Sequence, residues 1–87
     1  MSVDWVRDIA EMHQKYGVHE WIKNNPEKLE QLLHFRVAFL KEEFDETFKA
    51  TGEKDAEEIV DGLIDLCVVA IGTLDLFGID AHKAWQE

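Results

Sequence analysis

The sequence has little positive charge, and this lack limits the partners that the protein can bind. Its 87 residues include nine lysines and arginines against 19 aspartates and glutamates, for a formal net charge of −10 at pH 7. Binding to the phosphate backbone of a nucleic acid needs a basic surface, so nucleic acid is excluded as the expected partner. The same acidic balance suits a protein that collects cations.

Cysteine, long apolar runs and targeting segments are also scarce or missing. The single cysteine, Cys67, cannot form an internal disulfide and lies in an apolar run, so we expect a small buried hydrophobic residue. The longest uncharged stretch, residues 66–74, is far shorter than the roughly 20 residues that cross a bilayer. No basic and then apolar segment opens the sequence. We therefore expect a cytoplasmic protein with no membrane partner.

Strand signals are missing as well, because polar and apolar residues do not alternate over any long segment. Helix boundary residues are frequent instead. The first expected helices are residues 3–16 between Ser2 and Gly17, residues 18–23, and residues 26–50 between Asn25 and Gly52. The others are residues 56–77 between Asp55 and Gly78, and residues 81–87 after Asp80. The sequence therefore predicts an all-α helical bundle with a central antiparallel helix pair.

The length of the chain allows one domain, over residues 1–87, with a thin core. A chain of this size buries only about 60% of its unfolded surface. The hydrophobic share of 46% is ordinary for a globular protein. Further burial by self-association is the default expectation, and we expect a homodimer or homotetramer.

Acidic residues interrupt the apolar face of the expected helix over residues 26–50. With about 100° of rotation per residue, one broad apolar face is formed by Leu29, Leu32, Leu33, Phe39, Leu40 and Phe44. Glu43 falls near the middle of this face and Glu46 on the adjoining ridge. Asp45 points to solvent, and Glu42 lies at the edge. Two carboxylates thus occupy positions where the pattern calls for leucine.

The expected helix over residues 56–77 has the same anomaly. Glu58, Asp61 and Asp65 are spaced by three and four residues and share an arc of about 60°. The helix is otherwise apolar around about two-thirds of its girth, which predicts that it is buried. If it packs on the apolar face of residues 26–50, the two sets of acidic side chains meet in the interior.

A buried set of like charges must be neutralised. Two carboxylates about 4 Å apart repel by roughly 4 kcal/mol at an effective dielectric near 20. Desolvation adds several kcal/mol per ion, against a domain stability of about 5–15 kcal/mol. Arg36 and Lys54 are the basic residues nearby, too few for five acids. All-oxygen ligands without cysteine or a well-placed histidine suit Mg²⁺ or Mn²⁺ rather than zinc.

Several of these residues have a simpler interpretation. Each acid taken singly is typical of a solvated surface, and Glu58 could merely complete a capping box with Asp55. Arg36 could hold a phosphate, but an ion pair with Glu43 is favoured. Lys54 is typical of an exposed loop. Trp5, Trp21 and Phe35 are expected to be core residues rather than a base-stacking wall. His34 is expected to be solvated.

The acidic segments resemble the signature of a known family. Residues 42–46, Glu-Glu-Phe-Asp-Glu, fit a Glu-Glu-x-x-Glu element, and residues 58–61, Glu-Ile-Val-Asp, fit Glu-x-x-Asp. Over residues 29–80 the sequence resembles the MazG-like, all-α nucleoside triphosphate pyrophosphohydrolases, relatives of phosphoribosyl-ATP pyrophosphohydrolase and of the dimeric dUTPases.

The resemblance implies an activity: Mg²⁺-dependent hydrolysis of a nucleoside triphosphate between the α- and β-phosphates, which gives the monophosphate and pyrophosphate. The implied catalytic metal ligands are Glu43, Glu46, Glu58 and Asp61, with Glu42 and Asp65 as candidates for a further ion or for orienting water. Lys54 matches a position where longer relatives carry a basic residue near the substrate, and Arg36 is a second candidate for the substrate phosphates.

Two other functions stay open. The substrate could be phosphoribosyl-ATP, although no basic segment for the phosphoribosyl group is recognisable in the sequence. A different class is a non-catalytic helical oligomerisation module that binds Mg²⁺ or Ca²⁺ only for structure. Only eleven residues separate Glu46 from Glu58, which is short for the family and requires a tight connecting loop.

Overall fold

The protein consists of helices, with no strand among residues 4–87, which are the residues that this computed structural model describes. The elements in chain order are α1 (Trp5–Lys15), α2 (Val18–Asn24), the short 3-10 helix η1 (Pro26–Lys28), α3 (Leu29–Gly52), α4 (Ala56–Leu76) and α5 (Ala81–Gln86). The prediction of an all-α fold is confirmed.

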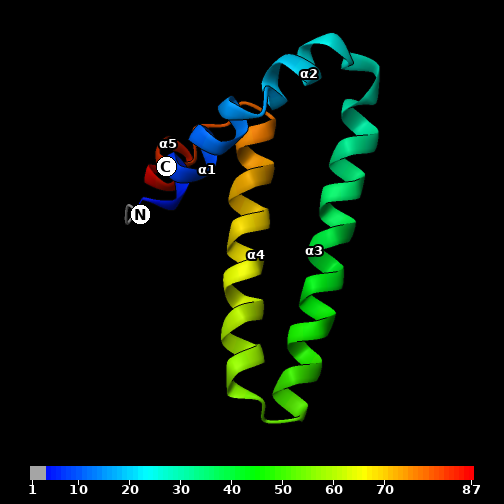
Figure 1. Ribbon diagram of the computed structural model, residues 1–87, viewed down its shortest axis with the longest axis vertical. Helices are drawn as coiled ribbons and strands as arrows, with labels where there is room; N and C mark the ends of the chain where they lie inside the picture. Colours follow the sequence, from blue (N-terminus) through cyan, green and yellow to red (C-terminus); the bar gives the residue numbers. More distant parts are fainter. Residues whose placement is uncertain (1–3) are drawn as a thin grey trace.

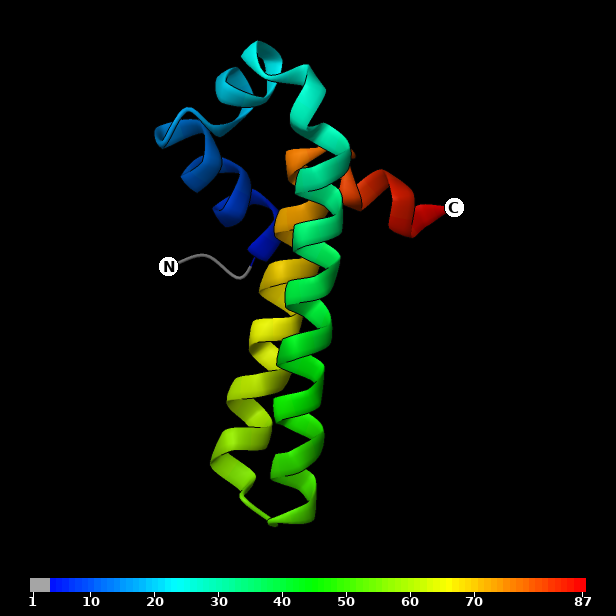
Figure 2. The ribbon, with the colours of Figure 1, turned by 90° about the vertical axis from the view of Figure 1, so that its right-hand side faces the viewer.

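The two longest helices, α3 and α4, lie side by side and antiparallel, joined by a tight turn (Figure 1). The shorter helices α1, α2 and α5 gather at the other end of this pair, away from the turn (Figure 2). No helix of the described chain covers the end of the pair that carries the α3–α4 turn. The acidic segments lie at that uncovered end.

Side-chain caps fix where three helices begin. The Asp4 carboxylate accepts a hydrogen bond from the backbone N–H of Arg7 at 3.1 Å, and α1 begins directly after it. The predicted cap of this helix, Ser2, lies outside the described residues, and Asp4 takes that role. Asp55 and Asp80 accept equivalent bonds at the starts of α4 and α5, as predicted.

The ends of α3 differ from the prediction. Pro26 opens the 3-10 turn, and the α-helix itself begins at Leu29. Gly52 is the last helical residue, but it does not make the turn. Lys54 makes it, with a left-handed φ of 56°. The backbone N–H of Asp55 then bonds to the carbonyl of Ala50 at 3.1 Å, which satisfies an unpaired carbonyl at the end of the helix.

The chain exposes more surface than a self-contained protein of its mass. Its accessible surface is 6974 Å², whereas a folded monomer of 10.1 kDa is expected to expose about 5,300 Å². Its radius of gyration is 14.6 Å, against about 12 Å for a compact chain of this length. About 1,700 Å² of surface therefore exceeds what a monomer normally exposes.

Much of this surface is apolar and lies on α4. Val60, Leu63 and Ile64 are 58%, 52% and 43% exposed, and Cys67 is exposed beside them. The predictions that this helix and Cys67 are buried are therefore wrong for the single chain. The prediction that Trp5, Trp21 and Phe35 are core residues is wrong for the same reason, since all three are exposed.

Among residues 4–87, no helix is long and apolar enough to cross a membrane.

Candidate functional site

The contact between Thr47 and Gly62 brings α3 and α4 close together. A Cβ atom placed on Gly62 would lie 2.1 Å from the hydroxyl oxygen of Thr47, so only glycine allows this approach. Thr47 is buried, and its hydroxyl donates a hydrogen bond of 2.8 Å to the backbone carbonyl of Glu43. The approach sets the acidic residues of the two helices opposite one another.

These acidic residues line one small hollow of about 50 Å³ between α3 and α4. Its lining residues are Glu43, Glu46, Thr47, Glu58, Asp61, Gly62 and Asp65. The structure thus brings together the four predicted metal ligands and Asp65. It leaves Glu42, Lys54 and Arg36 outside the lining.

The predicted burial of this acidic set is wrong for the single chain. Glu43 is half-buried, whereas Glu46, Glu58, Asp61 and Asp65 are exposed. The reason is that α3 and α4 alone flank the hollow, at the end of the pair that no other helix covers. Water therefore screens the carboxylates in part, and their repulsion is smaller than the sequence suggested.

The pKa of Glu43 reports the charge that gathers in the hollow. Partial burial raises this pKa above its usual value, and the nearby carboxylates of Glu46, Asp65 and Glu42 raise it further. Like charges and desolvation both disfavour the ionised form. A cation in the hollow would reverse that electrostatic balance.

The donor set fits a hard divalent cation. Every charged group that lines the hollow is a carboxylate, and oxygen ligands of this kind suit Mg²⁺ or Mn²⁺. A volume of about 50 Å³ accommodates an ion together with a water ligand, since one water occupies about 30 Å³ in the liquid. Glu43, Glu46, Glu58, Asp61 and Asp65 are the residues that could hold it.

A larger and more open hollow adjoins the acidic one. It measures about 380 Å³, shares Glu46 and Glu58 with its neighbour, and includes Lys49 and Asp55 in its lining. Lys49 lies 3.8 Å from Glu53 in an exposed ion pair. The sequence pattern did not single out Lys49, although its place one turn after Glu46 was a signal.

Arg36 of α3 is directed at the carboxyl-terminal half of α4, away from the acidic hollow. Its guanidinium donates hydrogen bonds to the Thr73 hydroxyl at 3.0 Å and to the Val69 carbonyl at 3.1 Å. Burial lowers its pKa. The predicted ion pair with Glu43 is wrong, because these two acceptors on α4 hold the guanidinium instead.

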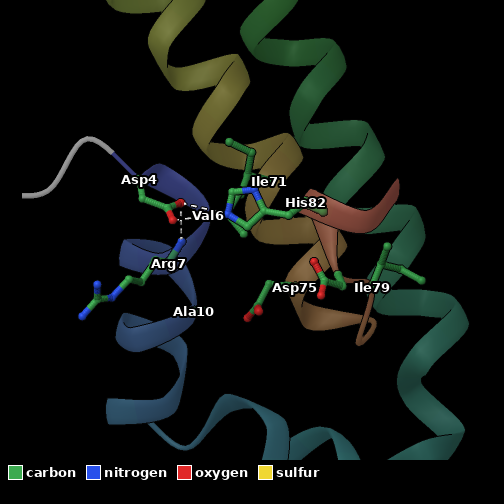
Figure 3. Close-up of a pocket in the computed structure, with 10 residues that line it drawn as sticks. Asp4, Val6, Arg7, Ala10, Ile71, Asp75, Ile79 and His82 are labelled. Atoms are coloured by element: carbon green, nitrogen blue, oxygen red, sulfur yellow. Dashed lines mark hydrogen bonds and ion pairs between the residues drawn. The ribbon is translucent and has the colours of Figure 1, made fainter. Parts of the chain in front are cut away.

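A separate pocket of about 280 Å³ lies where α1, α4 and α5 meet. Figure 3 shows the side chain of His82 of α5 directed at Asp4, next to the start of α1. Both carboxylate oxygens of Asp4 lie 3.2 Å from the ring nitrogen Nε2 of His82. This contact ties the two ends of the described chain together. None of the predicted metal ligands lines the pocket.

Comparison with known protein families places most of the chain in a known family. Residues 10–87 match phosphoribosyl-ATP pyrophosphohydrolase, a family of the same superfamily as the MazG-like enzymes. No curated protein and no solved structure gives a significant match. The matched region covers the described acidic hollow and nearly all of the chain. The chain belongs to the phosphoribosyl-ATP pyrophosphohydrolase family.

Proposed function

We propose that this pyrophosphohydrolase is a Mg²⁺-dependent enzyme that cleaves nucleoside triphosphates into the monophosphate and pyrophosphate. One observation carries the proposal: five carboxylates from two facing helices line a single hollow. No lysine, arginine, histidine or cysteine lines that hollow. Such a site attracts divalent cations, and through them a polyphosphate.

A divalent ion held by these carboxylates would supply positive charge that stabilises the charge developing on the transferring phosphoryl group. Glu46, Glu58 and Asp61 would hold the ion from both helices. A water oxygen forms the new bond to phosphorus, the bridging phosphorus–oxygen bond breaks, and pyrophosphate leaves. Glu43, the least exposed of the five carboxylates, lies beside these ligands and is the candidate to accept the proton of that water. Asp65 would orient the water.

Basic side chains near the hollow are candidates for the substrate phosphates. Lys49 lines the adjoining hollow, which is large enough for part of a nucleotide. Lys54 lies in the tight turn that follows α3. Arg36 keeps a phosphate role only if substrate displaces its contacts with α4. Lys49 and Lys54 are therefore the stronger candidates.

Phosphoribosyl-ATP is the alternative substrate, and the family match favours it. It is also cleaved at a polyphosphate, so the acidic hollow would serve either reaction in the same way. The scarcity of basic residues near the hollow favours an ordinary nucleoside triphosphate. The chemistry at phosphorus is common to both proposals.

A homodimer or homotetramer would complete the fold. The exposed apolar stripe of α4 (Val60, Leu63, Ile64, Cys67) matches what a second copy of this chain would cover. The surplus exposed surface of about 1,700 Å² is within the range that one subunit of an obligate oligomer buries. A second copy would also cover the end of the helix pair where the acidic hollow lies.

The decisive experiment incubates the protein with Mg²⁺ and each of eight nucleoside and deoxynucleoside triphosphates, and separately with phosphoribosyl-ATP. Separation of monophosphate from diphosphate products identifies the bond cleaved. Asp61→Asn should abolish pyrophosphate release, whereas the matched control Asp45→Asn should not, since Asp45 pairs with Lys41 at 2.8 Å on the exposed side of α3. Folded protein without turnover on any substrate would favour the non-catalytic, metal-stabilised module.

A further inference from the structure

Two histidines and an aspartate form a second cluster far from the acidic hollow. His13 lies in the last turn of α1, His19 in α2, and Asp75 in the last turn of α4. Among residues 4–87 they are the one group of three such side chains whose ligand atoms all lie within 4.8 Å of one another. Asp75 is ten residues beyond Asp65, or roughly 15 Å along the helix.

The three ligand atoms converge on one point. Nδ1 of His13 lies 2.6 Å from Oδ2 of Asp75, and Nε2 of His19 lies 2.9 Å from the same oxygen. Each imidazole donates to that oxygen, so protons occupy the space between the ligand atoms. Ligands around a tetrahedral ion at about 2.0–2.1 Å are separated by roughly 3.4 Å. An opening of less than 1 Å would therefore admit an ion.

Packing holds the cluster in place. The side chain of His13 is only 9% exposed, and its ring lies against Gly72 of α4, where an added Cβ would meet Cε1 at 3.7 Å. Burial opposes ionisation of Asp75, but its hydrogen bonds from the two histidines outweigh that effect and lower its pKa. The Asp75 carboxylate is thus held by both rings beside a fixed imidazole.

We propose that His13, His19 and Asp75 form a binding site for a late first-row divalent metal ion such as Zn²⁺. Two imidazoles and one carboxylate are a donor set that Zn²⁺ accepts and that Mg²⁺ does not favour. His19 is 47% exposed, which leaves the fourth position open to water. Each ligating nitrogen gives up its proton to the other ring nitrogen or to solvent when the ion binds.

The site would join three helices. Its ligands come from α1, α2 and α4, so an ion would fasten the α1–α2 pair onto the carboxyl end of α4. Nothing in this assignment depends on hydrolysis at the acidic hollow. Metal binding here and activity there can be measured separately.

The test uses Co²⁺ as a spectroscopic probe on metal-free protein, with excess Mg²⁺ to occupy the acidic hollow. One equivalent of Co²⁺ should give the absorption bands of a tetrahedral site, and Zn²⁺ should displace it. The same result is expected in the double variant Glu46→Gln, Asp61→Asn, which weakens the acidic hollow. Loss of the spectrum in that double variant would assign the ion to the acidic hollow and overturn the proposal.

Substitution of His19 tests the ligand set without disturbing buried packing. His19→Gln keeps a side-chain donor but removes the imidazole, and should weaken Co²⁺ binding by at least about 100-fold. His34→Gln and His82→Gln, at the other histidines of the chain, should leave the affinity unchanged. Asp75→Asn is the second variant and should also abolish the spectrum. Wild-type affinity in the folded His19 and Asp75 variants would refute the site.

Discussion

The hydroxyl oxygen of Thr47 lies 2.1 Å from the position that a methyl group on Gly62 would occupy. This contact sets the spacing of α3 and α4 at the level of the acidic hollow. Gly62 lies next to Asp61, and the Thr47 hydroxyl bonds to the carbonyl of Glu43. The geometry of the proposed metal site therefore depends on two residues that carry no charge.

Gly62→Ala should separate the two helices. The added methyl clashes with a buried side chain, and overpacking of this kind costs about 1–3 kcal/mol. We expect a lower free energy of unfolding by denaturant and weaker Mg²⁺ binding. Thr47→Ala in the same chain removes the clashing hydroxyl and should restore part of both. If Gly62→Ala left the denaturant midpoint of unfolding unchanged, or if adding Thr47→Ala restored neither stability nor Mg²⁺ binding, the close contact of Thr47 with Gly62 would be contradicted.

The raised pKa of Glu43 predicts how stability depends on pH without divalent ions. Its pKa in the folded chain is raised above its usual value of 4.5, so folding takes up a proton at pH values between the two. This group's contribution to stability is fully present below 4.5 and lost as pH rises through the higher folded value. Metal-free protein should therefore become more stable as pH falls from neutral toward that window.

Glu43→Gln provides the control for this pH dependence. The variant lacks the ionisable group, so its melting temperature should be higher at neutral pH and should change less between pH 7 and about 5. Mg²⁺ should reduce the same pH dependence in the wild-type chain by neutralising the neighbouring carboxylates. Asp75, whose pKa is lowered, acts in a different window: its contribution to stability is fully present above its usual value of 3.8 and is lost as the pH falls below it. Identical profiles for wild type and variant would exclude the assignment.

Helical periodicity predicted most of the fold and of the acidic hollow, because both depend on local sequence. The caps Asp55 and Asp80 act through neighbouring backbone groups, and the spacing of Glu58 and Asp61 fixes the face they share. Burial was not predictable in this way. Periodicity shows that one face of α4 is apolar, but it cannot distinguish cover by the same chain from cover by a second copy.

Polar contacts between residues far apart in the sequence were also not predictable from the local pattern. Arg36 binds Thr73 and the Val69 carbonyl, which are more than 30 residues away. Nothing in the local pattern distinguishes those acceptors from Glu43, which is closer in sequence. The cluster of His13 with Asp75 was missed for the same reason, since the two residues meet only once α1 packs on α4.

Lys54→Gly separates a role in the turn from a role in substrate binding. Lys54 has a φ of 56°, a left-handed conformation that costs a residue with a side chain about 1–2 kcal/mol and glycine little. The variant should therefore be about 1 kcal/mol more stable. If Lys54 also contacts the phosphates, KM for the triphosphate should rise at the same time. The KM of Lys49→Gln for the triphosphate should be measured alongside, because Lys49 is the other candidate for the substrate phosphates.

Leu63→Asp tests whether a second copy covers the apolar stripe of α4. The wild-type chain should elute as a dimer or tetramer of 10.1 kDa subunits, because a monomer would leave about 1,700 Å² of surplus surface in water. A charge in the centre of the stripe should dissociate it, whereas Gln31→Asp, an exposed site on α3, should not. Light scattering after gel filtration measures the masses.

The rate at which a thiol reagent reacts with Cys67 tests the same interface independently. Its thiol is exposed in the single chain and lies one helical turn from Leu63. A covering subunit would protect it, so a thiol reagent should react slowly with the wild type and rapidly with Leu63→Asp. Rapid reaction of the wild type would show that no second subunit covers Cys67. A wild-type mass of one subunit at micromolar concentration would contradict the oligomer, because the stripe of α4 would then be open to solvent.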